Sequence, residues 1–240
     1  MTPTNTIAKK EQIVEYISNG ETVKLSPGLI KRYLVSGGGN VTAEEVNMFL
    51  TLCRFQHLNP FIRDAYLIKY GDTQPATMVI GKDVFMKRAQ KQPEFDGIEA
   101  GLIVRNKESG AVDERPGTFY QKGVEDLIGA WAKVYMKNTR VPFYVSIPLD
   151  EYIGRKKNGE VNQQWAAKPA TMIRKVAVAQ ALREAFPEQN SGGMYVQEEL
   201  PEAQEIVLDD EAVIVQEEPK EEVKEEVKEE KSSVANALFN

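Results

Sequence analysis

This 240-residue chain is poor in the side chains from which catalytic and metal centres are most often built. It has one cysteine, Cys53, and one histidine, His57. A lone cysteine excludes an intrachain disulfide and fits a reducing cytoplasm. One residue of each kind nearly excludes a zinc site with His and Cys ligands. Their four-residue spacing would suit a catalytic dyad on one helix, but a core cysteine near a capping or surface histidine is the favoured interpretation.

Signals for membranes, nucleotides and metal catalysis are also missing. No apolar run reaches the eighteen or more residues of a membrane span, and the N-terminal twelve residues have no hydrophobic targeting core. Gly81-Lys82-Asp83 lacks the earlier glycine and the Ser/Thr of a phosphate loop, so ATP binding is not expected. Scattered acids could form a two-metal nuclease site, but their spacing matches no such motif: Asp64, Asp83, Asp96 and Glu99. We expect a soluble cytoplasmic protein that is not an enzyme and needs no cofactor or metal.

What the chain does have is charge that is sorted along its length. The whole protein has a net charge of −6. Residues 131–183 nevertheless carry ten basic and three acidic side chains, whereas residues 201–240 carry four lysines and thirteen acids. A polyanion partner for the body, with an acidic tail kept apart from it, explains this sorting better than a uniform solubilising surface.

Aromatic rings alternate with the cations of the basic stretch: Trp131, Tyr135, Phe143, Tyr144, Tyr152 and Trp165. Cations that neutralise phosphates and rings that stack on bases are what a sequence-tolerant single-strand binder needs. Rings in strands are more often core residues, so most of the six are expected to be buried. Trp165 lies in the polar loop VNQQWAAKP and is the best candidate for exposure, although the ring could equally pack under that loop.

Hydrophobic periodicity and turn signals predict an α+β fold with an antiparallel β-sheet framed by helices. We expect helices at 43–57, 82–92, 150–155 and 169–186, and strands at 65–70, 76–80, 97–105, 111–120, 131–136 and 141–147. Thr42 and Glu45 have the spacing of a capping box at the start of the first helix. The Gly and Pro spacing of the last four strands is typical of an antiparallel meander. The glycine run at 37–39 is expected to be a flexible joint.

Three parts follow from this pattern. Residues 1–40 form an N-terminal segment expected to make oligomer contacts, and 41–198 form the core. Residues 199–240 form an acidic, low-complexity tail that is expected to be disordered. Its mildly apolar end, SSVANALFN, could instead be a docking peptide.

The predicted helix at 169–186 is apolar around most of its circumference and should be largely buried. It nevertheless carries Arg174, Lys175 and Arg183. Burying a cation is costly unless an anion or hydrogen-bond acceptor meets it. Two interpretations are open: these residues pair with internal carboxylates or reach the surface, or they bind an external polyanion.

Three blocks of residues resemble the phage recombination proteins of the Bet type and their RecT relatives. The first block is Leu58-Asn59-Pro60, Arg63-Asp64 and Tyr66. The second is Gly81 and Asp83 leading a helix, followed by Phe95-Asp96-Gly97. The third is Trp165, Pro169, Met172, Arg174, Gln180, Arg183, Ala185 and Phe186. Their order and separation also match, over roughly residues 40–195.

The resemblance implies a single-strand annealing protein with an α+β fold and a basic groove, which works without ATP as an oligomeric ring or filament. It further implies single-stranded DNA and an annealed duplex intermediate as ligands. A 5′→3′ exonuclease and a host single-strand-binding protein are the implied partners. The family's basic groove positions correspond to Arg63, Arg174 and Arg183, with Lys175 beside them. Ala170, Thr171 and Val176 stand where basic residues are found in the family. Those contacts would be lost here or supplied by other cations, for which the candidates are Lys168, Lys82, Lys87 and Arg88.

The resulting hypothesis is ATP-independent annealing of complementary single strands in phage or prophage recombination. The expected nucleic-acid-binding residues are Arg63, Lys82, Trp165, Lys168, Arg174, Lys175 and Arg183. A competing hypothesis is a passive single-stranded-DNA-binding protein without annealing activity. The sequence is also compatible with a metal-dependent nuclease, or with a structural oligomer whose basic face contacts its own tail.

Overall fold

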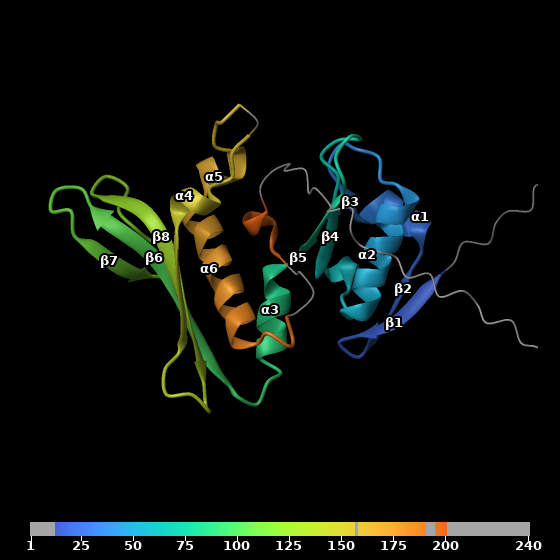
Figure 1. The fold of residues 1–240 in the computed structure, drawn as a ribbon, viewed down its shortest axis with the longest axis horizontal. Coiled ribbons are helices and arrows are strands. Elements are labelled where there is room, and N and C mark those ends of the chain that lie inside the picture. Colours follow the sequence, from blue (N-terminus) through green and yellow to red (C-terminus); the bar gives the residue numbers. More distant parts are fainter. Residues whose placement is uncertain (1–12, 157, 191–194, 201–240) are drawn as a thin grey trace, which may run out of the picture. The chain divides into compact units, whose positions relative to one another are not determined.

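Three antiparallel or mixed sheets and two principal helices organise the computed structural model, which describes residues 13–156, 158–190 and 195–200 (Figure 1). The strands are β1 (Val14–Ser18), β2 (Glu21–Leu25), β3 (Val35–Ser36), β4 (Ala65–Ile68), β5 (Thr77–Ile80), β6 (Phe95–Asn106), β7 (Val112–Pro116), β8 (Glu125–Met136) and β9 (Phe143–Pro148). The α-helices are α1 (Pro27–Leu29), α2 (Ala43–Phe55), α3 (Lys82–Ala89), α4 (Leu149–Tyr152), α5 (Gln163–Ala167) and α6 (Pro169–Ala185). A π-helical turn η1 (Ile30–Leu34) and two 3₁₀ turns, η2 (Pro60–Ile62) and η3 (Gln197–Glu199), complete the elements. The predicted α+β class is confirmed.

The largest sheet has the order β7-β6-β8-β9, so the expected meander is wrong at one position. β8 pairs with β6 and not with β7. The reason lies in the lengths and polarity of the strands. β6 and β8 each have twelve residues and several buried side chains, whereas β7, VDERP, is exposed along its whole length. A polar strand suits the edge of a sheet, and the two long apolar strands pair at its centre.

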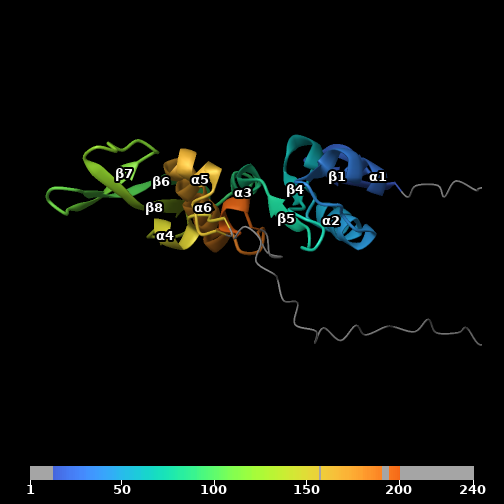
Figure 2. The same cartoon turned by 90° about the horizontal axis from the view of Figure 1, so that it is seen from above.

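Helix α6 covers one face of this sheet, where it contacts β6, β8 and β9 (Figures 1 and 2). Pro169 starts the helix, and the side chains of Ile173, Val176 and Leu182 are fully buried. The other side of α6 contacts α3 and α5. Because the helix is covered on both sides, its apolar circumference is explained and the predicted burial is confirmed.

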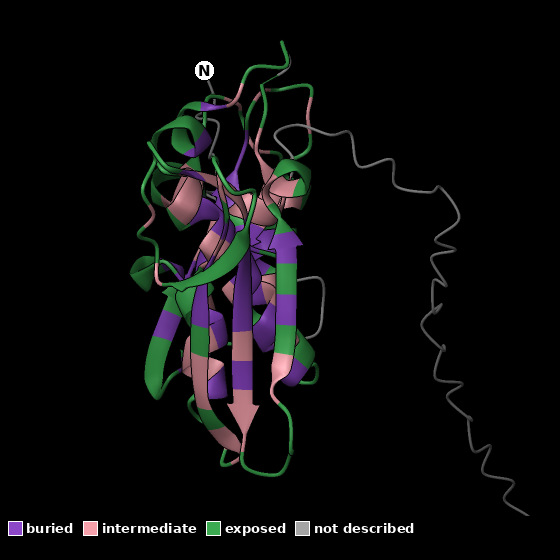
Figure 3. Cartoon of the chain, turned by 90° about the vertical axis from the view of Figure 1, so that its left-hand side faces the viewer, coloured by how far each residue is buried: buried purple, intermediate pink, exposed green. Residues whose placement is uncertain are grey.

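Strand β9 shows the two faces of the sheet most clearly (Figure 3). Val145 and Ile147 are buried toward α6, and they alternate with the exposed residues Tyr144 and Ser146. This period of two is the pattern of a strand with one covered face.

The N-terminal hairpin β1–β2 was not predicted, although its turn signal stands in the sequence. Asn19 and Gly20 connect the strands with φ of 51° and 85°. Asn-Gly is the preferred pair for a two-residue turn that needs positive φ at both positions. The hairpin places Tyr16 and Leu25 in the core, and Tyr16 donates a hydrogen bond of 2.6 Å to the carbonyl oxygen of Leu58. The part of the segment 1–40 that the structure describes therefore contributes to the core, while its expected role in oligomer contacts stays a prediction.

The glycine run at 37–39 is packed against β4 and is not the loose joint that we expected. β3 runs parallel to β4, and the backbone of Lys69 bonds to Ser36 and Gly39 at 2.8 and 3.1 Å. Gly37 has φ +97°, and a Cβ there would lie 2.2 Å from the Lys69 carbonyl oxygen. A side chain at this position would prevent the close approach of the two backbones.

Glu45 joins the start of α2 to β4 and the following turn. It completes the predicted capping box with Thr42, and its Oε1 accepts hydrogen bonds from Lys69 Nζ at 2.6 Å and the Ala76 amide at 2.7 Å. Burial opposes the charge of Glu45, but the hydrogen bonds from Lys69, Thr42 and Ala76 outweigh it and hold its pKa below the usual value. The ammonium of Lys69 is buried, so this carboxylate is its necessary partner.

Cys53 and His57 do not form a dyad. Cys53 is fully buried, and burial raises the pKa of its thiol to about 12. The exposed ring of His57 places Nδ1 at 2.8 Å from the carbonyl oxygen of Ile17. The favoured interpretation of a core cysteine is confirmed.

Within the described residues, no helix combines the length and the apolar character that crossing a bilayer requires. Of the expected disordered tail at 199–240, residues 201–240 lie outside the described residues, and Glu199 belongs to the 3₁₀ turn η3.

Replacing Glu45 with alanine should lower the free energy of unfolding by about 3 kcal/mol, because it leaves the buried Lys69 unpaired and removes the capping box. Urea denaturation followed by circular dichroism measures this, and the matched change Glu44→Ala at the exposed neighbouring carboxylate should cost far less. Since the folded-state pKa of Glu45 is depressed, its contribution should be complete above the unfolded value of about 4.3. It should disappear as the pH falls through the lower folded-state pKa; an equal loss in both variants would contradict this role.

Candidate nucleic-acid interface

A rigid turn at residues 59–64 presents Arg63 to solvent. Asn59 caps the 3₁₀ turn by accepting a hydrogen bond from the Phe61 amide at 3.0 Å, and Pro60 occupies the first position. Arg63 follows in the left-handed region with φ 63°. This backbone conformation is uncommon outside glycine and persists where surrounding contacts impose it. Here the amides of Arg63 and Asp64 donate to the carbonyls of Pro60 and Asn59, both at 3.1 Å.

Helix α3 starts directly against this turn. The Gly81 amide donates to the carbonyl oxygen of Asp64 at 2.9 Å. A Cβ at Gly81 would lie 2.6 Å from the Arg63 carbonyl oxygen, so only glycine permits the contact without a shift. Two blocks of the family resemblance, the Arg63-Asp64 pair and the Gly81-Asp83 pair, are thereby brought together by backbone contacts.

A hollow of about 510 Å³ opens between the turn, α3, α6 and η3. Its charged lining residues are the cations Arg63, Lys82, Lys87 and Lys175 and the acids Asp64, Asp83 and Glu198. Cations exceed acids by one. Among the described residues Arg63 has no ion-pair partner, so its charge is available at the mouth of the hollow.

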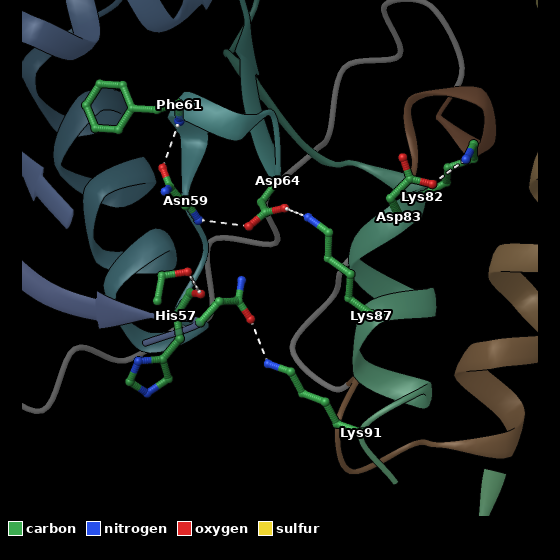
Figure 4. A network of polar contacts seen from close by, with 10 residues as sticks. His57, Asn59, Phe61, Asp64, Lys82, Asp83, Lys87 and Lys91 are labelled. Carbon is green, nitrogen blue, oxygen red and sulfur yellow. Dashed lines mark hydrogen bonds and ion pairs between the residues drawn. The ribbon is translucent and has the colours of Figure 1, made fainter. Parts of the chain in front are cut away.

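Asp64 is the buried acid at the floor of this hollow (Figure 4). Its carboxylate accepts hydrogen bonds from the Asn59 amide at 3.2 Å and from Lys87 Nζ at 2.9 Å. Lys87 lies on α3, and its side chain is 43 % exposed. The contact therefore ties α3 to the turn while leaving part of the lysine accessible.

A second hollow of about 330 Å³ adjoins the first, and the two share Asp64, Val84 and Lys87. It adds Arg88 and Lys91 from the end of α3. Burial holds the pKa of Arg88 below its usual value against the opposing charge of Asp64. Arg88 donates to the backbone of Gln56 at 2.7 Å. Lys91, labelled in Figure 4, donates to Asn19 at 2.6 Å. Arg88 is thus an anchor between elements, and the exposed Lys91 is the freer cation.

A third hollow of about 190 Å³ extends the first in the other direction, because the two share Lys82, Asp83 and Lys175. It adds Arg174, whose Nε donates to the Ala100 carbonyl oxygen at 3.3 Å. Four of the seven expected binding residues therefore surround two connected hollows: Arg63, Lys82, Arg174 and Lys175. Lys168 is exposed at the N-cap of α6 and does not line them.

The expected exposure of Trp165 is wrong. Its side chain is 3 % exposed, and its amide donates to the side chain of Asn162 at 2.9 Å. The ring lies so close to Gly154 that a Cβ there would be 2.7 Å from Trp165 Cδ1. Trp165 lies on helix α5 and not in a loop, and the burial of its ring, which the second interpretation allowed, leaves no face for a base to stack on.

Arg183 is an internal brace in this structure and not a free cation. Its guanidinium forms a two-pronged ion pair with Glu199, one prong at 2.6 Å, and lies 5.1 Å from the ring centre of Tyr195. Burial opposes its charge, but the hydrogen bonds and charge of Glu199 outweigh it and hold the pKa of Arg183 above its usual value. The expected phosphate contact at Arg183 would require breaking this pair.

The expected site left out Lys91 and named Lys87 only as a possible replacement contact. A helical projection of the predicted helix at 82–92 could have placed both, because residues 87 and 91 are four apart and share a face. Glu198 was also missed, and nothing in its local sequence predicts a contact with α6.

Two of the acids that a two-metal site would have required, Asp64 and Asp83, line the same hollow, but each is paired with a lysine. Asp64 pairs with Lys87, Asp83 pairs with Lys82, and Glu99 accepts a hydrogen bond from Tyr135 at 2.9 Å. Over the described ranges, no three His, Cys, Asp or Glu side chains gather where they could hold one metal ion.

Glu199→Gln should lower the free energy of unfolding by about 3 kcal/mol, because it leaves the largely buried guanidinium of Arg183 without its anion. The adjacent change Glu198→Gln serves as the control. Its partner Lys175 is 30 % exposed, so the cost there should be at most about 1 kcal/mol. Thermal and urea unfolding distinguish the two, and equal stability of both variants would show that Arg183 is not a brace.

Comparison with known proteins agrees with the resemblance of the three blocks. A model of the RecT family matches residues 20–214. No curated protein matches the chain. RecT family proteins act generally in phage recombination as annealing proteins of single-stranded DNA. The match covers most of the chain, including the turn at 59–64, helix α3 and helix α6, and we conclude that this protein belongs to the RecT family.

Proposed function

We propose that this chain binds single-stranded DNA along the three connected hollows and anneals it to a complementary strand without ATP. The observation that carries the proposal is the meeting of Arg63, Lys82, Lys87 and Lys175 around one hollow, from three separate stretches of sequence. With Lys91 and Arg174 in the adjoining hollows, these cations form what we call the cationic track. The track takes the place of the basic groove expected from the family.

Cations along a track lower the repulsion between two polyanions. A protein that neutralises phosphates releases their counterions, and this release supplies affinity that does not depend on base sequence. The bases of the bound strand are then read by the second strand, so no contact code for base edges is needed. Such a reaction requires no bond-breaking step, and we propose that the protein is not an enzyme.

Annealing by an assembly of subunits follows from the same argument. A nascent duplex that spans several copies would be held more tightly than by one copy, because each further contact is intramolecular. We therefore propose a homo-oligomer in the form of a ring or filament, acting in the bacterial cytoplasm. A 5′→3′ exonuclease would supply the single strand, and host single-strand-binding protein is a further expected partner.

The proposal is tested by mixing complementary oligonucleotides, one with a fluorophore and one with a quencher, without nucleotide. The wild-type protein should speed up pairing over the protein-free rate. A passive single-stranded-DNA-binding protein would slow it instead. Shortening of labelled DNA in the presence of Mg²⁺ would indicate a nuclease.

Arg63→Ala should weaken binding to an oligo-dT strand about fivefold, which corresponds to ~1 kcal/mol for one charged contact. The slope of log affinity against log salt should become shallower by about 0.7. Fluorescence anisotropy at several salt concentrations measures both quantities. The fold should be unchanged, because the side chain is exposed.

Arg140→Ala is the matched control, since Arg140 is also exposed but lies in the turn between β8 and β9 and lines none of the three hollows. Its salt slope should equal that of the wild type. The same slope in the Arg63 variant would remove Arg63 from the site.

A further inference from the structure

The segment 195–200 forms one wall of the cationic track and is held by its backbone and by Glu199. The Ile80 amide donates to the Tyr195 carbonyl oxygen at 2.9 Å, and Val196 is buried. Glu199 accepts from the Val196 amide at 3.0 Å and pairs with Arg183. These contacts fix the path of the segment across α6, independently of the side chain of Glu198.

Glu198 has a different environment from its neighbour. Its carboxylate points to Lys175 at 2.7 Å, and both side chains line the hollow that contains Arg63. Lys175 is 30 % exposed, whereas Arg183 is 21 % exposed and lies against two rings. Glu199 therefore faces the interior, whereas Glu198 faces the track.

The contact between Glu198 and Lys175 has the chemistry of a lysine–phosphate contact. In both, an ammonium donates a charge-assisted hydrogen bond to an anionic oxygen. A DNA phosphate that enters the hollow would meet Lys175 already occupied by an anion of the protein itself.

We propose that Glu198 is an internal substitute for a DNA phosphate, which holds Lys175 in the free protein and gives it up to the bound strand. This inference rests on the proposed function. The exchange needs only a rotation of the Glu198 side chain, because the backbone of 195–200 is held by Val196, Tyr195 and Glu199. The wall of the track stays in place while its charge pattern changes.

The substitute sets how strongly the track attracts a polyanion. Cations exceed acids by one in the hollow while Glu198 is charged and present. Glu198 also gives Lys175 an anionic partner in a place from which solvent is partly excluded, where an unpaired ammonium would be unfavourable. Glu198 thus preserves the fold without DNA at the expense of affinity for DNA.

The test is oligo-dT binding by full-length protein with Glu198→Gln, measured by anisotropy across a series of salt concentrations. The variant should bind about fivefold more tightly at 0.1 M salt with an unchanged slope, because the strand contacts Lys175 in both proteins and in the variant has no carboxylate to displace. Glu184→Gln removes the same charge at an exposed position of α6 that lines no hollow of the track, and it should leave the affinity at the wild-type value.

The double variant Lys175→Gln/Glu198→Gln tests whether Glu198 affects DNA binding through Lys175. Relative to Lys175→Gln alone it should show no gain in affinity, because the lysine that Glu198 would otherwise occupy is absent. If Glu198→Gln and Glu184→Gln bind oligo-dT with the same affinity while the wild type binds DNA, the substitute role is wrong and the proposed function stands. If neither the wild type nor Glu198→Gln binds oligo-dT, both proposals are overturned.

Discussion

A buried carboxylate, that of Asp64, is the constraint on which the candidate interface depends. It accepts from the Asn59 amide and from Lys87, while its backbone carbonyl accepts from the Gly81 amide. The first bond lies within the turn that presents Arg63, and the other two connect that turn to helix α3, which carries Lys82 and Lys87. Because a buried carboxylate is tolerated only where partners satisfy it, the bonds that satisfy Asp64 also hold the turn and α3 together.

The candidate interface differs from a purely cationic surface because three acids lie among its cations. A surface of cations alone would repel itself and bind any polyanion, whereas paired cations are held in place. Asp64, Asp83 and Glu198 each contact one lysine of the track. They differ in what holds them: Asp64 is buried, Asp83 is exposed, and Glu198 is in between. Arg63, which has no ion-pair partner among the described residues, and the partly exposed lysines are the cations that we propose for an external phosphate.

Much of the fold could be predicted from the sequence because its elements have strong local signals. The capping box at Thr42 and Glu45 and the apolar circumference of α6 both predicted what the structure has. The order of the large sheet could not be predicted in the same way, since the pairing of β6 with β8 depends on matching two distant strands. The hairpin β1–β2 had a local signal, Asn19-Gly20, that we overlooked.

The site was predicted less completely for a physical reason. Residue type and family resemblance identified cations on α6, but only tertiary structure decides which carboxylate meets each one. Glu198 and Glu199 are adjacent, yet one pairs with Lys175 at the track and the other with Arg183 in the interior. Trp165 likewise stands among polar residues in the sequence, yet its side chain is buried in the structure.

Lysine footprinting tests the central claim most directly. Full-length protein is acetylated with and without saturating oligo-dT, and each lysine is quantified by mass spectrometry. Lys82, Lys87, Lys91 and Lys175 should be protected by DNA, while Lys24 and Lys107, which line none of the three hollows, should react equally in both samples. Protection confined to lysines outside the track, with these four unchanged, would contradict the account.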